Sequence, residues 1–219
     1  VGQTIGGNRT EAWRRHEPAP LQPRECRTTA ARARERPAVR TKETTMIFGT
    51  RVTIGPIIPS DLGRLFQWTD SAENAHLNGT YRPPNWESQE NFWLRTEDPA
   101  SIFFAIRIQP SPEIAGYVQI RDIAPVHRSA KIGIWLGEAG DRGRGYGRDS
   151  LRLAIDYCWR QLNLRRLSLE VFAHNHAALR MYEALGFQEE GILREAQFID
   201  GQWIDIVLMA LRRDPKQPG

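Results

Sequence analysis

Short segments in which apolar and polar residues alternate recur along the chain, a pattern typical of half-buried β-strands. We expect strands at residues 51–54, 103–108, 114–120, 130–136 and 167–173. In the fourth of these, Ile132, Ile134 and Leu136 share one face. Gly133 and Trp135 lie on the other face. The alternation therefore predicts strands whose two faces have different surroundings.

Elsewhere, apolar residues recur every three or four positions, as they do in amphipathic helices. We expect helices over 62–68 (with Ser60 and Asp61 as candidate caps), 90–95, 148–162, and from Asn175 to a stop at Gly186. Two more alternating segments flank Asp200-Gly201, a pair typical of a type I′ hairpin turn. Strands with interspersed helices that close on a hairpin predict an α/β domain of three layers around a mixed sheet.

A glycine-rich loop with the sequence RGRGYG occupies residues 142–147, between a predicted strand and a predicted helix. Glycine lets a ligand approach the main chain closely, and the first turn of a helix presents unpaired N–H groups at its positive end. Arg142 and Arg144 add positive charge. The loop therefore predicts a site for a phosphate or pyrophosphate group.

The spacing of the loop distinguishes between known phosphate-binding patterns. It lacks the Lys-Ser/Thr pair of the nucleotide P-loop, and its glycines do not have the G-x-G-x-x-G spacing of dinucleotide sites. Arg142, Gly145 and Gly147 do match the pattern [Q/R]-x-x-G-x-[G/A]. About 30 residues later, a second motif follows at Asn175, Ala178, Tyr182, Gly186 and Phe187. A third lies in the segments EGILRE (190–195) and DGQWID (200–205).

These motifs together resemble those of the GNAT superfamily of acyl-CoA-dependent N-acyltransferases, over roughly residues 51–212. The resemblance is to the branch of ribosomal-protein-alanine and polyamine acetyltransferases. It implies a mixed, mostly antiparallel central sheet, splayed at the acyl-CoA site and flanked by helices. It also implies acetyl-CoA as the donor and a primary amine as the acceptor. A protein N-terminus, a polyamine and another small amine all stay open as acceptors.

The resemblance also implies roles for particular residues. Main-chain groups of Ile134, Trp135 and Leu136 would pair with the pantetheine arm of the coenzyme. The loop would bind its pyrophosphate through Arg142, Gly143, Arg144, Gly145, Tyr146 and Gly147, and Asn175 and Ala178 would line its other side. Tyr182 would donate a proton or a hydrogen bond to the departing thiolate. Read from spacing alone, Tyr182 would be a core residue of a helix stripe.

The resemblance names no base for the acceptor amine. Related sequences often carry a glutamate at the position of Lys131, and a lysine is a base only if its pKa is strongly depressed. Glu170 and Asp205 are alternatives, although each is more simply a structural or solvated carboxylate. Ordered water is another. We expect the acceptor itself to contact the aromatic, proline-containing segment that holds Tyr81, Arg82 and Trp86.

Charge is distributed unevenly along the 219 residues. The first 45 hold ten Lys/Arg against five Glu, a net charge of +5, whereas the remaining 174 hold twenty basic against twenty-one acidic residues, a net charge of −1. We expect a disordered basic extension at 1–45, an N-acetyltransferase domain at 46–214 and a short tail at 215–219. Our hypothesis is that the extension is not part of the native protein, which would then start at Met46.

Composition limits the other possibilities. The only cysteines, Cys26 and Cys158, form neither a disulfide framework nor a metal-ligand spacing, so we expect no metal, and Cys158 is most simply a core residue. The sequence has no apolar run of membrane-spanning length, and we expect no membrane partner and a cytoplasmic location. The hairpin around Asp200-Gly201 is a candidate homodimer interface.

Two functions of other classes stay open at this stage. The first is a catalytically silent acyl-CoA-binding module with the same fold, used for regulation. The second is association with nucleic acid, which we expect only through the basic extension, since the domain itself is nearly neutral.

Overall fold

The computed structural model of the chain describes residues 46–71, 79, 83–94 and 98–214. The predicted basic extension, the predicted tail at 215–219, and both Tyr81 and Arg82 lie outside the described residues. The described residues form the helices α1 (Leu62–Thr69), α3 (Trp86–Leu94), α4 (Tyr146–Arg160) and α5 (His176–Ala184), with 3-10 turns η1 (Pro59–Asp61) and η2 (Ala139–Asp141).

One sheet contains every strand of the described residues, in the order β1-β2-β3-β4-β5-β6-β8-β7. All neighbours pair antiparallel except β5 and β6, which run parallel. The strands are β1 (Ile47–Phe48), β2 (Val52–Pro56), β3 (Ile102–Ile108), β4 (Ile114–Ala124), β5 (Ser129–Leu136), β6 (Arg166–Phe172), β7 (Gln188–Ile199) and β8 (Gln202–Arg212). The expected mixed, mostly antiparallel sheet is confirmed.

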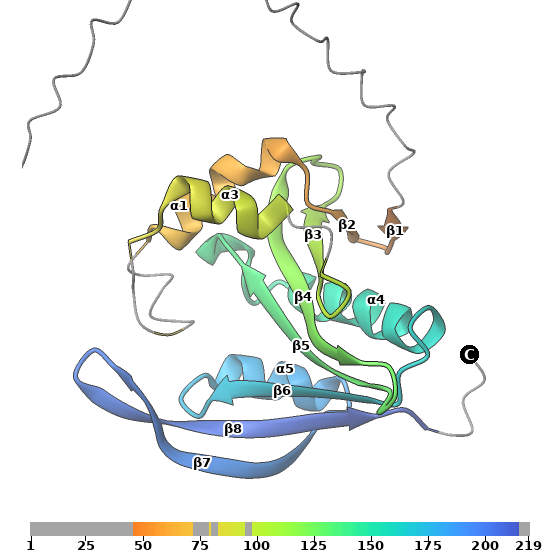
Figure 1. Cartoon of the computed structure of the whole chain (residues 1–219), viewed down its shortest axis with the longest axis vertical. Helices are drawn as coiled ribbons and strands as arrows, with labels where there is room; N and C mark the ends of the chain where they lie inside the picture. Colours follow the sequence, from red (N-terminus) through yellow and green to blue (C-terminus); the bar gives the residue numbers. More distant parts are fainter. Residues whose placement is uncertain (1–45, 72–78, 80–82, 95–97, 215–219) are drawn as a thin grey trace, which may run out of the picture. The chain divides into compact units, whose positions relative to one another are not determined.

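The sheet splits between its two parallel strands. Residues 129–131 of β5 pair with residues 166–168 of β6, and the pairing stops there. Beyond Lys131 the two strands diverge, so that β5 rises toward α1 while β6 stays beside β8 (Figure 1). The far half of β5 therefore has a hydrogen-bonding edge with no strand partner, and the splay implied by the resemblance is confirmed.

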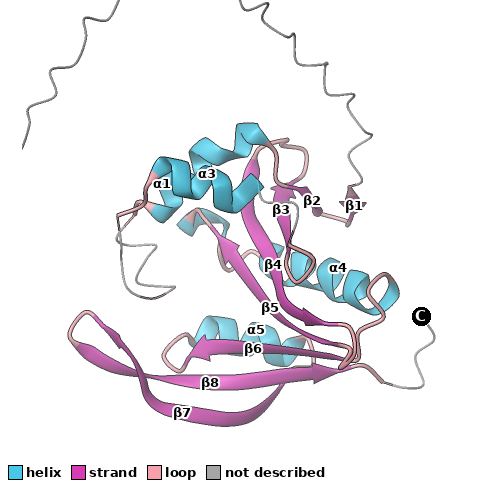
Figure 2. Cartoon of the chain, in the orientation of Figure 1, coloured by secondary structure: helices cyan, strands magenta, loops and turns pink. Residues whose placement is uncertain are grey.

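Helices cover both faces of the sheet and give the predicted three layers (Figure 2). On one face, α4 and α5 pack on a core that includes Ile132, Leu151 and Leu167, with Ile134 and Leu136 beside it. On the other face, α1 and α3 pack on a second cluster. Trp135 belongs to this second cluster, as the alternation along 130–136 predicts.

The hairpin and the stop of α5 follow the predicted turn chemistry. Asp200 and Gly201 have φ values of 47° and 78°, and Ile199 pairs with Gln202 across them. Two successive residues with positive φ are the signature of a type I′ turn. Gly186, with φ 91°, ends α5 in the left-handed conformation that favours glycine.

Two local predictions were wrong. The helix expected over 90–95 begins at Trp86, because the Asn85 side chain accepts the Ser88 N–H at 3.1 Å and caps the turn directly after the prolines. Asp61 does not cap α1 with its side chain. Its carboxylate instead accepts the Ile58 N–H at 2.9 Å and pairs with the buried Arg107 at 2.8 Å. A buried guanidinium needs a charged partner more than a helix end needs a cap.

Candidate functional site

A cleft with a volume of about 780 Å³ opens between the free half of β5, the glycine-rich loop, α4 and α5. Most of the residues predicted to bind the coenzyme line it: Ile134, Trp135, Leu136, Arg142, Gly143, Arg144, Gly145, Gly147, Asn175 and Ala178. Tyr146 and Tyr182 are not part of the lining. The structure thus brings two motifs that are distant in sequence to one cavity.

The glycine-rich loop lies along one end of the cleft and leads into the start of α4. Within the described residues, the amides of residues 143–148 donate to no acceptor, and the first amide of this region that does is Asp149, to the Gly145 carbonyl at 3.1 Å. Gly143 and Gly145 have φ values of 72° and 85°. A run of amides without an acceptor that ends in the first turn of a helix is the arrangement typical of anion sites.

Arg142 fastens the loop to the sheet. Its guanidinium donates to the carbonyls of Leu136 at 3.3 Å and Gly137 at 3.2 Å, and its own N–H donates to Ala139 at 3.1 Å. These bonds hold the start of the loop against the end of β5. Arg142 thus differs from the residues after it, whose amides are available to a ligand.

The opposite wall of the cleft comes from the second motif. Asn175 is the N-cap of α5, and its side-chain oxygen accepts the Ala178 N–H at 3.1 Å. The same helix brings Met181 close to α4: a Cβ built on Gly147 would lie 3.3 Å from the Met181 sulfur. The capped helix therefore sets the width of the cleft opposite the loop.

Tyr182 lies on α5, in the core beneath this wall. The residue is 6% exposed, and its ring meets Phe187 edge-on with the centroids 5.6 Å apart. Burial raises the pKa of the Tyr182 phenol to about 12. The phenol thus keeps its proton at neutral pH.

A residue that sequence reasoning missed lies against the loop. Arg51, just before β2, donates from Nε and Nη2 to the Asp149 carboxylate at 2.9 and 2.6 Å. Its Nη1 donates to the Arg144 carbonyl at 3.0 Å, and Arg51 also lines the cleft. Nothing in the sequence near Arg51 marks it, because its partners are 93 and 98 residues away.

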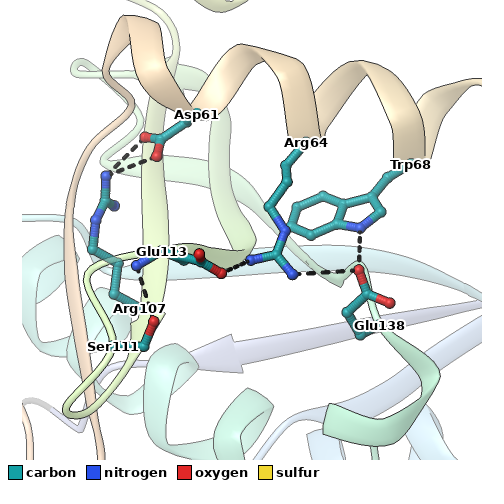
Figure 3. A network of polar contacts seen from close by, with 7 residues as sticks. All are labelled: Asp61, Arg64, Trp68, Arg107, Ser111, Glu113 and Glu138. Atoms are coloured by element: carbon teal, nitrogen blue, oxygen red, sulfur yellow. Dashed lines mark hydrogen bonds and ion pairs between the residues drawn. The ribbon is translucent and has the colours of Figure 1, made fainter.

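On the other side of β5, side chains of α1 reach the end of the strand (Figure 3). Glu138 accepts the Trp68 indole N–H at 2.9 Å and lies 3.7 Å from Arg64. Arg64 also pairs with Glu113 at 2.5 Å. Figure 3 shows Arg64 and Trp68 pointing from one face of α1 toward the segment that leads into the glycine-rich loop.

The carboxylates considered as bases are all paired. Glu170 lies 3.2 Å from the Lys131 ammonium and, with Asp122, raises the pKa of that lysine. Lys131 therefore stays protonated, which agrees with its rejection as a base. Asp205 accepts from Arg194 at 2.6 Å and from the Glu195 N–H at 2.8 Å, and these bonds lower the pKa of its carboxyl group.

The described part of the chain has neither a metal-ligand cluster nor a membrane-spanning helix. Across its residues, no group of three or more His, Cys, Asp or Glu side chains is placed to hold a metal ion. No helix there combines the length and the apolar character needed to cross a bilayer. Cys158 is fully buried, as expected of a core residue.

Comparison with known proteins decides the family. The family model described as "Acetyltransferase (GNAT) domain" matches residues 51–188. The chain belongs to the GNAT acetyltransferase family. It is 36% identical over 123 residues to spermidine N(1)-acetyltransferase of Vibrio cholerae, an alignment that covers 56% of this chain and 70% of that protein.

Solved structures agree with this assignment. The GNAT chain is similar to the crystal structure of the Vibrio cholerae spermidine N-acetyltransferase in complex with CoA and spermine, with a TM-score of 0.69 and 26% identity over 75% of this chain and 96% of that one. The fold is shared with ribosomal-protein-S5-alanine acetyltransferase from Vibrio fischeri, with a TM-score of 0.69 and 19% identity, covering 80% and 100% of the two chains.

The GNAT chain is thus an acetyl-CoA-dependent N-acetyltransferase that transfers an acetyl group to an amine. The resemblance seen in the three motifs is confirmed. Nothing in the comparisons supports the alternative of a catalytically silent binding module.

Proposed function

We propose that this enzyme acetylates a primary amine of a polyamine, with the coenzyme in the cleft beside β5. The observation that carries the proposal is the similarity to the Vibrio cholerae spermidine acetyltransferase, at 36% identity over 123 residues. The structure of that protein with CoA and spermine has the same fold as this chain. A polyamine is also the acceptor that best fits the side chains near the end of β5.

On the donor side, three elements would each bind a different part of acetyl-CoA. The free amides of residues 143–148 suit the two negative charges of the pyrophosphate. The unpaired edge of β5 at Ile134–Leu136 suits the amide groups of the pantetheine arm, which can add to it like a strand. Asn175 and Ala178 would face this arm from α5. The first two assignments use main-chain groups that make no helix or strand pairing along the cleft.

Tyr182 would act as the general acid. When the free amine nitrogen forms its bond to the acetyl carbon, the carbon–sulfur bond breaks and the nitrogen gives one proton to water. The sulfur leaves with the electron pair and needs a proton. Burial raises the pKa of the Tyr182 phenol to about 12, so the group holds its proton at neutral pH and is present as a donor to the sulfur. Proton donation by Tyr182 would thus complete the departure of the thiol, and solvent would then reprotonate the phenolate.

The acceptor would approach from the side of α1 and α3. The rings of Trp93, Phe103, Tyr117 and Trp135 form a chain of edge-on and tilted contacts there, with centroids 4.8 to 6.4 Å apart. Aromatic faces suit both the methylene segments and the ammonium groups of a polyamine. The Glu138 carboxylate, at the end of β5, would pair with a second ammonium group. Trp86 remains a candidate contact, with 48% of its surface exposed.

Assembly and location belong to the same proposal. Leu193, Phe198 and Trp203 of the β7–β8 hairpin are 46%, 53% and 61% exposed, and a homodimer that joins two hairpins would cover them. Because acetyl-CoA is an intracellular metabolite, we place the enzyme in the cytoplasm. Sedimentation of the full chain tests the dimer, and cell fractionation tests the location.

The experiment that tests the proposed function is thiol release from acetyl-CoA across a panel of amines. We expect spermidine and spermine to release thiol with kcat/KM at least about tenfold above amino acids, amino sugars and a peptide with an N-terminal alanine. A preference for the peptide would replace the polyamine by a protein N-terminus. Release with none of these amines, despite tight coenzyme binding, would contradict the acceptor class.

A further inference from the structure

Arg51 contacts the glycine-rich loop and the start of α4 through three hydrogen bonds from one guanidinium group. Arg51 makes a forked contact with one carboxylate oxygen of Asp149 and a third hydrogen bond to the Arg144 carbonyl. Asp149 lies in the first turn of α4, and Arg144 lies in the loop. A single planar guanidinium thus joins three segments: the residues before β2, the glycine-rich loop and the start of α4.

The bond to the Arg144 carbonyl orients the amides that face a ligand. In a trans peptide, the carbonyl of one residue points opposite to the N–H of the next. When Arg51 holds the Arg144 carbonyl, the Gly145 N–H must therefore point away from Arg51. Gly145 has φ 85°, and a Cβ at this position would lie 2.6 Å from the Arg51 guanidinium. Arg51 can therefore lie this close to the loop only because residue 145 is a glycine.

The bond to Asp149 has an electrostatic role. A carboxylate in the first turn of a helix occupies the region where an anionic ligand is stabilised by the helix dipole. Without a cation beside it, Asp149 would repel the two charges of a pyrophosphate. Arg51 lies at salt-bridge distance, 2.6 Å, and offsets this charge. It also stacks over the Tyr146 ring, 5.5 Å from the centroid, where Arg144 lies on the same ring at 5.3 Å.

We propose that Arg51 is a positioning residue for the coenzyme: it holds the Arg144–Gly145 peptide and the Asp149 carboxylate so that the amides of residues 143–148 meet the pyrophosphate. This inference rests on the proposed use of the loop for acetyl-CoA. It assigns to a residue outside both sequence motifs the task of forming the anion site before the ligand arrives. Preorganisation of this kind strengthens binding without adding a contact to the ligand.

The test compares two acetyl donors: acetyl-CoA, which has the pyrophosphate, and acetyl-pantetheine, which lacks it. For Arg51→Ala we expect kcat/KM with acetyl-CoA to fall roughly 10- to 100-fold through KM, as for the loss of charge-assisted bonds. With acetyl-pantetheine, kcat/KM should change by less than about twofold. Damage to the fold as a whole would lower both.

Three further variants separate the two roles of Arg51. Arg51→Lys keeps the charge but not the fork, and should recover only part of the loss. In Arg51→Ala/Asp149→Asn the repulsion is gone, so the double variant should bind acetyl-CoA more tightly than Arg51→Ala alone. Arg160→Ala is the matched control, because Arg160 pairs with Asp156 at 2.8 Å near the other end of the same helix. It should bind acetyl-CoA like the parent protein.

Calorimetry with the full chain distinguishes the failure of this inference from failure of the proposed function. If the parent protein binds no acetyl-CoA, the function assigned to the loop is wrong. If the parent binds and either Arg51→Ala or Arg51→Lys binds equally tightly, the loop needs no such positioning and the inference is overturned. An equal loss with both donors would also overturn it, since the defect would not be specific to the pyrophosphate.

Discussion

The two sides of β5, one facing α4 and α5 and the other facing α1 and α3, present different chemical groups. Toward α4 and α5, the cleft offers main-chain amides and the unpaired strand edge, with glycines at the positions of closest approach. Toward α1 and α3 lie the aromatic rings of the second core cluster and the Glu138 carboxylate. In the proposed assignment, the donor is one fixed molecule whose pyrophosphate and amide groups main-chain atoms can bind, whereas the acceptor would be bound by side chains.

This difference explains why the residues of the cleft toward α4 and α5 can be predicted from the sequence, whereas those toward α1 and α3 cannot. A main-chain site requires particular φ values, and only glycine meets them cheaply, so the requirement leaves a spaced pattern of residues. A side-chain site can be built from many residues on many elements. The variants below test whether each side acts on its own substrate, from the largest expected effect to the smallest.

The largest effect should come from Gly145→Val. A β-branched residue at φ 85° is strained, and its Cβ would lie 2.6 Å from the Arg51 guanidinium. We expect the loop to shift and the Kd for acetyl-CoA to rise about 100-fold or more, as judged by calorimetry, because several amide contacts to the pyrophosphate are lost together. The KM for the amine, measured at saturating acetyl-CoA, should hardly change.

Gly143→Ala is the matched comparison for this variant. Gly143 has a similar φ of 72°, but a Cβ there meets no atom within 4 Å. Its cost is limited to backbone strain of about 1–2 kcal/mol, so we expect a rise in Kd of about tenfold. If both variants weakened binding equally, the contact between Arg51 and Gly145 would have no part in forming the site.

Features that depend on local sequence could be predicted. Asn175, Ala178 and Gly186 have their predicted positions because a cap and a helix stop are local requirements. The start of α3 was misplaced because two prolines suggested a loop that Asn85 in fact ends by capping the helix.

Arg51 and Asp61 were beyond prediction for a different reason. Each is defined by a partner far along the chain, Asp149 for the first and Arg107 for the second. An isolated arginine or aspartate leaves no spaced pattern, so only the folded chain shows what it binds. The acceptor face has the same difficulty, since its rings come from four separate elements and its carboxylate from the segment after β5.

Tyr182→Phe tests the group proposed to serve the reaction rather than either substrate. We expect kcat to fall about 100-fold with both KM values within about twofold, because the hydroxyl acts only when the thiolate departs. The ring stays packed on Phe187, so the midpoint of thermal unfolding should not drop. Turnover equal to that of the parent would leave Tyr182 as a core residue only.

The raised pKa of Tyr182 also predicts a pH dependence. Burial raises the pKa from 10.0 to about 12, so folding favours the protonated phenol. The stability that this provides is complete below pH 10, where the unfolded chain also keeps the proton, and is lost as the pH rises toward 12. Denaturant titrations between pH 9 and pH 11 should show the parent losing stability that Tyr182→Phe retains. Parallel losses in the two proteins would contradict the assigned pKa shift.

A smaller effect, confined to the acceptor, is expected from Glu138→Gln. The substitution removes one negative charge but keeps an oxygen for the Trp68 indole N–H, so α1 should stay in place. We expect the KM for spermidine to rise about fivefold, as for the loss of a partly exposed ion pair, with the KM for acetyl-CoA unchanged.

Glu113→Gln is the control for that variant, since Glu113 pairs with the same arginine, Arg64, but is not on the segment between β5 and the loop. It should leave the KM for spermidine within about twofold of the parent value. An equal rise in the KM for spermidine with both variants would mean that the effect comes from the lost ion pair with Arg64 and not from a lost contact with the acceptor.

The smallest effect should come from Lys131→Gln, at the point where β5 and β6 stop pairing. The side chain is 47% exposed and bridges Glu170 and Asp122 at 3.2 and 3.5 Å, and exposed ion pairs contribute about 0–1 kcal/mol. The strands on either side are held by main-chain bonds, so the splay should keep its width. We expect kcat/KM for both substrates to stay within about twofold and the pH profile to keep its shape. A displaced profile would give Lys131 the role in proton transfer that its raised pKa argues against.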